Sequence, residues 1–229
     1  MRKLTALEPI GLFLFIMAYI WIWRARHAEL WVAILACLVL SHLFHDESAR
    51  ELGFGRRSLS ECADRFGPAL AVLALLMLAA GLLLNTTRSI AVDQEFLALF
   101  AYLPWGLLQQ YMVNGYFLNR FDRAFSPGVS AWLTAALFGA AHTPNWFLMA
   151  VTIVGGWCAT QVYRRYRNLF FLGIAHATVG FLLFLTVPDS ISHHLNIGPR
   201  QLHRQQVRRT LPIPSHNDAL LLRSPRTSP

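Results

Sequence analysis

Residues 68–84 read PALAVLALLMLAAGLLL, a stretch without a single charged or strongly polar side chain. About 17 to 25 mostly apolar residues suffice for a membrane-crossing helix, because each residue advances the helix by about 1.5 Å. Comparable stretches recur on both sides of this one. The sequence therefore predicts an all-α fold, a polytopic transmembrane bundle of about seven spans, at residues 10–23, 30–44, 68–84, 96–118, 129–142, 144–163 and 169–187.

The composition excludes an ordinary soluble protein. Hydrophobic residues make up 55% of the 229-residue chain and charged residues only 14%, whereas soluble domains carry about 25% charged residues. The formal net charge is +8, and the excess arginine lies in loops and in the C-terminal tail. In a membrane protein such loop charge sets orientation. We therefore expect the lipid bilayer as the surroundings and no nucleic-acid partner.

The charge distribution also predicts topology and domain organisation. Most loop arginines fall on one side of a seven-span arrangement, so the positive-inside rule predicts a cytoplasmic N-terminus. Residues 1–187 form the predicted transmembrane domain. Residues 188–229 are basic and rich in Ser, Asn and Pro. They contain too little apolar surface to fold alone, which predicts a disordered C-terminal tail.

Three spans carry polar groups at positions where lipid would be expected. The fourth span contains Gln109, Gln110 and Asn114, the fifth ends at His142, and the seventh contains His176. Gln110 and Asn114 are four residues apart and share a helix face. Counted along their helices, Gln109, His142 and His176 lie roughly 13 to 18 Å from the arginine-rich side. Agreement in depth predicts a polar chamber between the fourth, fifth and seventh spans.

A helix restart is predicted beside this chamber. Pro144 follows His142 and Thr143 directly, which suggests Thr143 as the N-cap and Pro144 as the first helical residue of the sixth span. Irregular backbone at membrane depth is tolerated where it lines a cavity or is buried in protein. The alternative is that the polar residues only hold helices together, because intramembrane Gln, Asn and His also serve as interhelical hydrogen-bonding groups.

Taken in order, the three polar motifs resemble those of a known enzyme family. They read Gln109-Gln110-x-x-x-Asn114, Phe138-x-x-x-His142 and His176-x-x-x-Gly180. The CAAX protease and bacteriocin-processing (CPBP) family of intramembrane endopeptidases has Glu-Glu-x-x-x-Arg, Phe-x-x-x-His and His-x-x-x-Asn at these places. The match covers about residues 97–187. The resemblance implies that Gln109 takes the place of the water-activating glutamate and that His142 and His176 stabilise the oxyanion or position water.

The departures from the family pattern remove its general base. A carboxylate accepts a proton from water, whereas a carboxamide such as Gln109 is not basic near neutral pH and only orients the water. Between Phe96 and Val187 the one acidic residue is Asp122, at the membrane face. Two mechanisms remain open. Either His142 or His176 is the base, or both bind a divalent metal such as zinc, for which Gln109 would be a poor third ligand.

The function predicted from the sequence is that of an intramembrane endopeptidase of the CPBP type. It would cleave a peptide bond in a membrane-associated protein or peptide, with His142, His176, Gln109, Gln110 and Asn114 as the site residues and without a required cofactor. The alternative is a catalytically inactive relative that binds a peptide or protein partner in the same chamber. A transporter or channel ranks last because the spans lack charged pathway residues.

Overall fold

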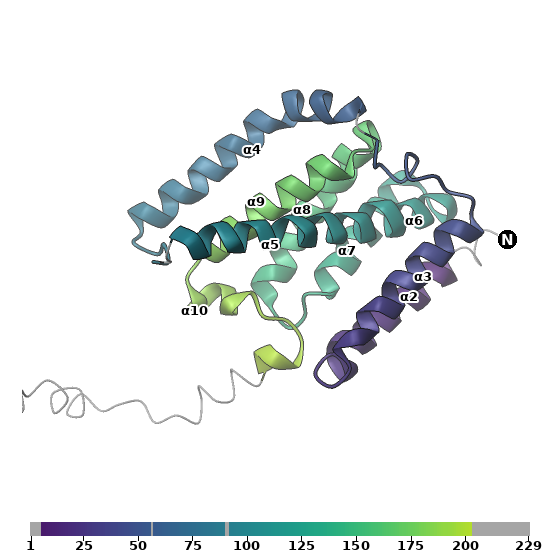
Figure 1. Cartoon of the computed structure of the whole chain (residues 1–229), viewed down its shortest axis with the longest axis horizontal. Helices are drawn as coiled ribbons and strands as arrows, with labels where there is room; N and C mark the ends of the chain where they lie inside the picture. Colours follow the sequence, from purple (N-terminus) through teal and green to yellow (C-terminus); the bar gives the residue numbers. More distant parts are fainter. Residues whose placement is uncertain (1–5, 56, 90–91, 203–229) are drawn as a thin grey trace, which may run out of the picture.

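The chain folds into a bundle of helices, seen from the side in Figure 1. The structure, a computed structural model, describes residues 6–55, 57–89 and 92–202. Within these ranges there is no β-strand, only an isolated bridge between Phe54 and Asn168. The predicted all-α bundle is confirmed.

Every predicted span coincides with a helical segment. The first two spans form a pair of neighbouring helices, and the fourth is one continuous rod made of α5, the π-helical turns η3 and α6. Three helices, α4, α8 and α9, are long and apolar enough to cross a membrane by length and composition. The bounds are α2 Leu7–Ala18, η1 Tyr19–Trp23, η2 Ala28–Leu30, α3 Trp31–Phe44, α4 Arg57–Leu83, α5 Val92–Gln110, η3 Tyr111–Leu118, α6 Asn119–Ala124, α7 Pro127–Ala140, α8 Trp146–Tyr166, α9 Leu169–Thr186, α10 Asp189–Ser192 and η4 His193–Leu195.

Glycines allow α5 and α9 to cross with their backbones in contact. A Cβ atom on Gly106 would lie 2.7 Å from the carbonyl oxygen of Gly173, and one on Gly173 would lie 2.9 Å from Cα of Leu107. Small residues at such crossings let transmembrane helices approach closely. This crossing places Gln110, one turn beyond Gly106, opposite His176 on α9.

The pair α7 and α8 is packed in the same manner. A Cβ atom on Gly139 would lie 2.4 Å from Cγ1 of Ile153, and one on Gly156 would lie 3.1 Å from the ring of Phe138. His142 follows Gly139 by three residues and is thereby held at the junction of α7 and α8. Helix α4 packs less closely than these helices. Only 6% of its most apolar 18-residue stretch is buried inside the protein, whereas 44% of the corresponding stretch of α9 is buried.

The turn between α7 and α8 departs from the predicted capping arrangement. Asn145, not Thr143, is the N-cap of α8, and its side chain accepts a hydrogen bond from the backbone N–H of Leu148 at 3.2 Å. Thr143 and Pro144 lie in the turn before the helix, joined by a cis peptide bond. Asn145 is the better cap here because its amide also donates to the carbonyl oxygens of Ser192 and Asn196.

The first part of the predicted disordered tail is ordered. Residues 188–202 form α10, η4 and a further helical turn, and they fold back against the α7–α8 turn. The backbone N–H of Gly198 donates to the carbonyl oxygen of Thr143 at 2.8 Å, and Arg88 forms an ion pair with Asp189. Composition alone predicts disorder because it does not include these contacts with distant residues. Residues 203–229 lie outside the described residues.

Candidate active site

A cavity of about 550 Å³ lies between α4, α5, α8 and α9. Gln109, Gln110, His142 and His176 all line it, so the structure brings together four of the five predicted site residues. The fifth, Asn114, is fully buried and lies behind Gln110. We call this cavity the chamber.

Gln110 connects Asn114 to His176 through a chain of hydrogen bonds. The Asn114 amide donates to Oε1 of Gln110 at 2.7 Å, and Nε2 of Gln110 lies 3.0 Å from Nδ1 of His176. A neutral imidazole has one N–H donor and one acceptor nitrogen. With the Gln110 amide donating to Nδ1, the proton of His176 is on Nε2, so this histidine presents a hydrogen-bond donor.

His142 is held in the opposite tautomer. Its Nδ1 lies 2.7 Å from the backbone carbonyl oxygen of Phe138. A carbonyl oxygen only accepts hydrogen bonds, so Nδ1 carries the proton and Nε2 has a free lone pair. The rings of both histidines contact the ring of Phe138, with centroid distances of 5.0 Å for His142 and 5.9 Å for His176. One histidine therefore offers an acceptor and the other a donor next to the same ring.

Gln109 lies where the chamber meets a second cavity. This second cavity has a volume of about 460 Å³ and is enclosed mainly by apolar side chains of α2, α3, α5 and α7. Gln109, Phe138 and His142 line both cavities. The Gln109 amide has no hydrogen-bond partner among the described residues, so its oxygen and nitrogen are available to a water molecule or a substrate.

Gly180 lines the chamber beside Tyr102. A Cβ atom on Gly180 would lie 3.3 Å from the ring of Tyr102. A larger side chain at this position would therefore require Tyr102 to shift.

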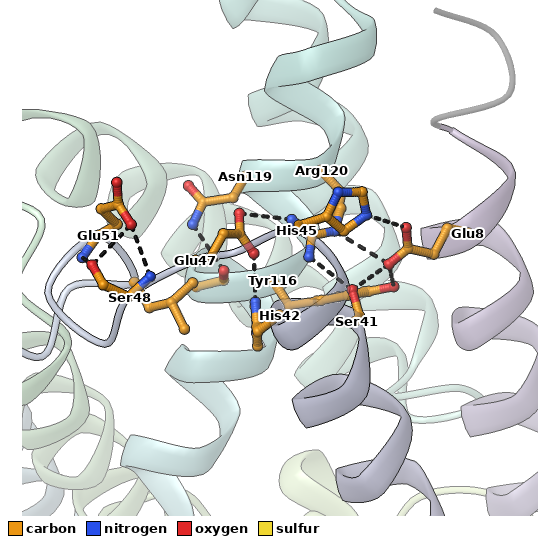
Figure 2. Close-up of polar contacts among 12 residues, drawn as sticks. Glu8, Ser41, His42, His45, Glu47, Ser48, Glu51, Tyr116, Asn119 and Arg120 are labelled. Atoms are coloured by element: carbon orange, nitrogen blue, oxygen red, sulfur yellow. Dashed lines mark hydrogen bonds and ion pairs between the residues drawn. The ribbon is translucent and has the colours of Figure 1, made fainter. Parts of the chain in front are cut away.

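Two carboxylates that sequence reasoning overlooked form a separate polar cluster, shown in Figure 2. Glu8 on α2 and Glu47 after α3 both bind the fully buried guanidinium of Arg120, with distances of 3.2 Å from Nε to Glu8 and 2.8 Å from Nη1 to Glu47. Nη2 of Arg120 donates to Ser41 at 2.7 Å. Both precede the family-like segment 97–187, from which the sequence alone offers no reason to expect a contact with them.

These carboxylates do not supply the missing base. Arg120 lies ten residues beyond Gln110, about 15 Å along the helix, and among the described residues no Asp or Glu lines either cavity. Burial raises the pKa of Glu47, but the hydrogen bond and charge of Arg120 and the hydrogen bond with His42 outweigh it and lower the pKa from 4.5 to about 2. Glu47 is thus held ionised as the partner of Arg120.

The described residues around the chamber offer few ligands for a metal ion. In the described part of the chain no three His, Cys, Asp or Glu side chains are grouped so that they could hold a metal. His142 and His176 with the carboxamide of Gln109 form a poor ligand set for zinc, which prefers three or four His, Cys or carboxylate ligands. We therefore assign no step to a metal.

Comparison with known protein families gives a match to part of the chain. Residues 91–182 match the family model described as Type II CAAX prenyl endopeptidase Rce1-like. The matched segment runs from the start of α5 into α9 and includes all five predicted site residues. No curated protein and no solved structure matches the chain.

Proposed function

We propose that the chain, whose residues 91–182 match the model of the Rce1-like type II CAAX prenyl endopeptidases, is an intramembrane endopeptidase working without a glutamate base. Its substrate would be a membrane-associated protein or peptide, in the first place one with a prenylated C-terminal CAAX sequence, as the family name indicates. The observation that carries the proposal is the pair of chamber imidazoles, each bound through Nδ1, His142 to the Phe138 carbonyl and His176 to the Gln110 amide. These bonds assign an acceptor to Nε2 of His142 and a donor to Nε2 of His176.

In this mechanism His142 is the general base. Its Nε2 accepts a proton from water while the water oxygen attacks the carbonyl carbon of the scissile peptide bond. The resulting imidazolium then gives the proton to the leaving amine nitrogen as the C–N bond breaks. The hydrogen bond from Nδ1 to the carbonyl oxygen of Phe138 keeps the ring in the required tautomer throughout.

His176 and Gln109 act on the other atoms of the reaction. The Nε2–H group of His176 donates to the carbonyl oxygen, which becomes negatively charged during the attack, and this interaction is strong in a site that excludes water. Gln110 and Asn114 are positioning residues that hold His176 through its Nδ1. The free carboxamide of Gln109 accepts a hydrogen bond from the attacking water and orients it without removing a proton.

The test is cleavage of a farnesylated CAAX peptide by the purified full-length protein in lipid nanodiscs. We expect wild type to cut, His142→Ala and His176→Ala to lose roughly 10²-fold or more of kcat, and the exposed-loop variant His27→Ala to match wild type. Cutting that survives both chamber substitutions would overturn the assignment. Sensitivity of wild type to a chelator would show that a metal supplies the nucleophile instead.

The second candidate function is binding without cleavage. The absence of a carboxylate around the chamber in the described residues and the replacement of asparagine by Gly180 both favour it. In that case wild type binds the peptide but does not cut it, and Gln109→Glu gains cleavage because it restores the base of the related enzymes. Cleavage by wild type with His142 required excludes this alternative.

A further inference from the structure

Two unpaired arginines line the same end of the chamber. Arg24, just after η1, and Arg200, near the end of the described residues, both line the chamber that contains His142 and His176. Neither guanidinium has an ion-pair partner among the described residues. By contrast, Arg88 is paired with Asp189, and Arg120 is paired with Glu8 and Glu47.

The backbone brings these two arginines together although they lie far apart in the sequence. Gly198 packs against Ile20, where a Cβ atom on the glycine would lie 2.9 Å from Cγ2 of the isoleucine. Arg24 follows Ile20 by one helical turn, and Arg200 follows Gly198 by two residues. The chain that follows α10 runs towards the η1 end of the first helix pair (Figure 1), and its residues Leu195–Ile197 line the chamber together with Arg200.

Two guanidinium groups beside one largely apolar cavity favour an anion. Each is always charged; Arg24 is half-buried and Arg200 is exposed at the edge of the cavity, so an anion between them would be attracted by both. Guanidinium binds carboxylate and phosphate through two parallel N–H···O bonds. The chemistry of this end of the chamber therefore selects an oxyanion.

The length of chain that a peptide bound at the histidines extends beyond its scissile bond favours a peptide carboxylate over a lipid phosphate as the bound anion. Gly198 is hydrogen-bonded to Thr143, the residue next to His142, and Arg200 lies two residues beyond Gly198. An extended chain advances about 3.3 to 3.6 Å per residue, so three residues after the scissile bond span about 10 Å. A peptide held at the histidines would thus carry its terminal carboxylate towards this end of the chamber.

We propose that Arg24 and Arg200 bind the C-terminal carboxylate of the substrate peptide and thereby set how close to the C-terminus the chain is cut. The site itself follows from the arginines, while the identity of its occupant as a substrate rests on the proposed function. Arg24 and Arg200 are specificity residues, and neither takes part in proton transfer.

The test measures binding separately from cleavage. A farnesylated peptide with an N-terminal dye is prepared as the free acid and as the C-terminal amide, and both are titrated against full-length protein carrying His142→Ala in phosphatidylcholine nanodiscs. We expect the acid to bind about 10-fold or more tightly than the amide, the ratio that corresponds to a charge-assisted hydrogen bond. Adding Arg24→Gln or Arg200→Gln brings the ratio towards one, whereas Arg26→Gln, two residues from Arg24 and outside the chamber lining, leaves it unchanged.

The outcomes separate the two proposals. Equal binding of acid and amide, or a ratio unaffected by Arg24→Gln and Arg200→Gln, overturns the carboxylate site. Competition by dihexanoyl phosphatidate that depends on both arginines, with acid and amide bound equally, assigns the pair to a lipid phosphate and also overturns it. An acid preference that depends on both arginines, in a wild-type protein that does not cut, supports the carboxylate site and removes only the proposed peptidase activity.

Discussion

At the scale of single residues, the adjacent Gln109 and Gln110 differ in their contacts although they belong to one sequence motif. The spacing of Gln110 and Asn114 predicted a shared face, and their hydrogen bond confirms it. The sequence did not show that Gln110 contacts His176 while Gln109 remains unpaired, because that difference depends on the angle at which α5 crosses α9. Nor did it distinguish the tautomers of the two histidines, which are set by the Phe138 carbonyl and the Gln110 amide.

Substitution of Gln110 by methionine tests the hydrogen-bond chain. The side chain keeps its approximate volume but no longer holds Nδ1 of His176, so the imidazole is free to change tautomer. We expect kcat to fall by at most roughly 10²- to 10³-fold, the loss that follows removal of an oxyanion donor. KM should change little. Nitrogen NMR of labelled histidine reports the tautomer directly, and an unchanged His176 signal in Gln110→Met would contradict the positioning role.

At the scale of elements, the helices were predictable from local composition, whereas their contacts were not. Apolar stretches located the spans, and α4 extends further towards the N-terminus than predicted because its first turns are polar. The capping of α8 by Asn145 depended on carbonyl groups 47 and 51 residues away. Local sequence does not contain that information.

We predict that the close crossing of α5 and α9 does not tolerate a larger residue at Gly173. A Cβ atom on Gly173 would meet the backbone of Leu107, which has no freedom to move aside, so Gly173→Ala should destabilise the protein by about 1–3 kcal/mol and separate Gln110 from His176. Gly67 on α4 has nothing within 4 Å of its Cβ position. We therefore expect Gly67→Ala to be neutral or slightly stabilising. Unfolding in detergent, followed by circular dichroism, compares the two, and equal stability would contradict the crossing.

At the scale of the whole molecule, one buried arginine joins the N-terminal helices to the segment that contains the site. Arg120 is bound by Glu8 and Glu47, which are 112 and 73 residues away in the sequence, and Figure 2 shows α2, α3 and α6 meeting at its side chain. Charge pattern along the chain could not reveal this arrangement. It fixes α2 and α3 against the rod of α5, η3 and α6, and so encloses the second cavity beside Gln109.

Removal of this arginine should loosen the whole bundle. Arg120→Met removes the fully buried guanidinium that joins Glu8 to the mostly buried Glu47, and we expect a loss of about 3–5 kcal/mol in the free energy of unfolding. The matched variant Arg123→Met removes a partly exposed partner of the same Glu47, for which about 0–1 kcal/mol is expected. Denaturant titration in micelles measures both. Similar values for the two variants would show that Arg120 does not carry this role.

The same cluster gives the stability a dependence on pH. Glu47 has its pKa lowered from 4.5 to about 2 in the folded protein, so its stabilising contribution is complete above the unfolded value and is lost as the pH falls through about 2. We expect stability to decline between about pH 4.5 and 2, and Glu47→Gln to flatten that decline, whereas Asp64→Asn on exposed α4 should not. An unchanged pH profile in Glu47→Gln would remove Glu47 from this account.

In the proposed mechanism, Nε2 of His142 replaces the missing carboxylate as the base. The most direct measurement is the rate of cleavage of the farnesylated peptide by wild type and His142→Ala, each with and without added imidazole. We expect cleavage by wild type, a loss of roughly 10²-fold or more in the variant, and partial recovery when imidazole enters the vacated space. Equal rates in the two proteins, or an inactive wild type beside an active Gln109→Glu, would contradict it.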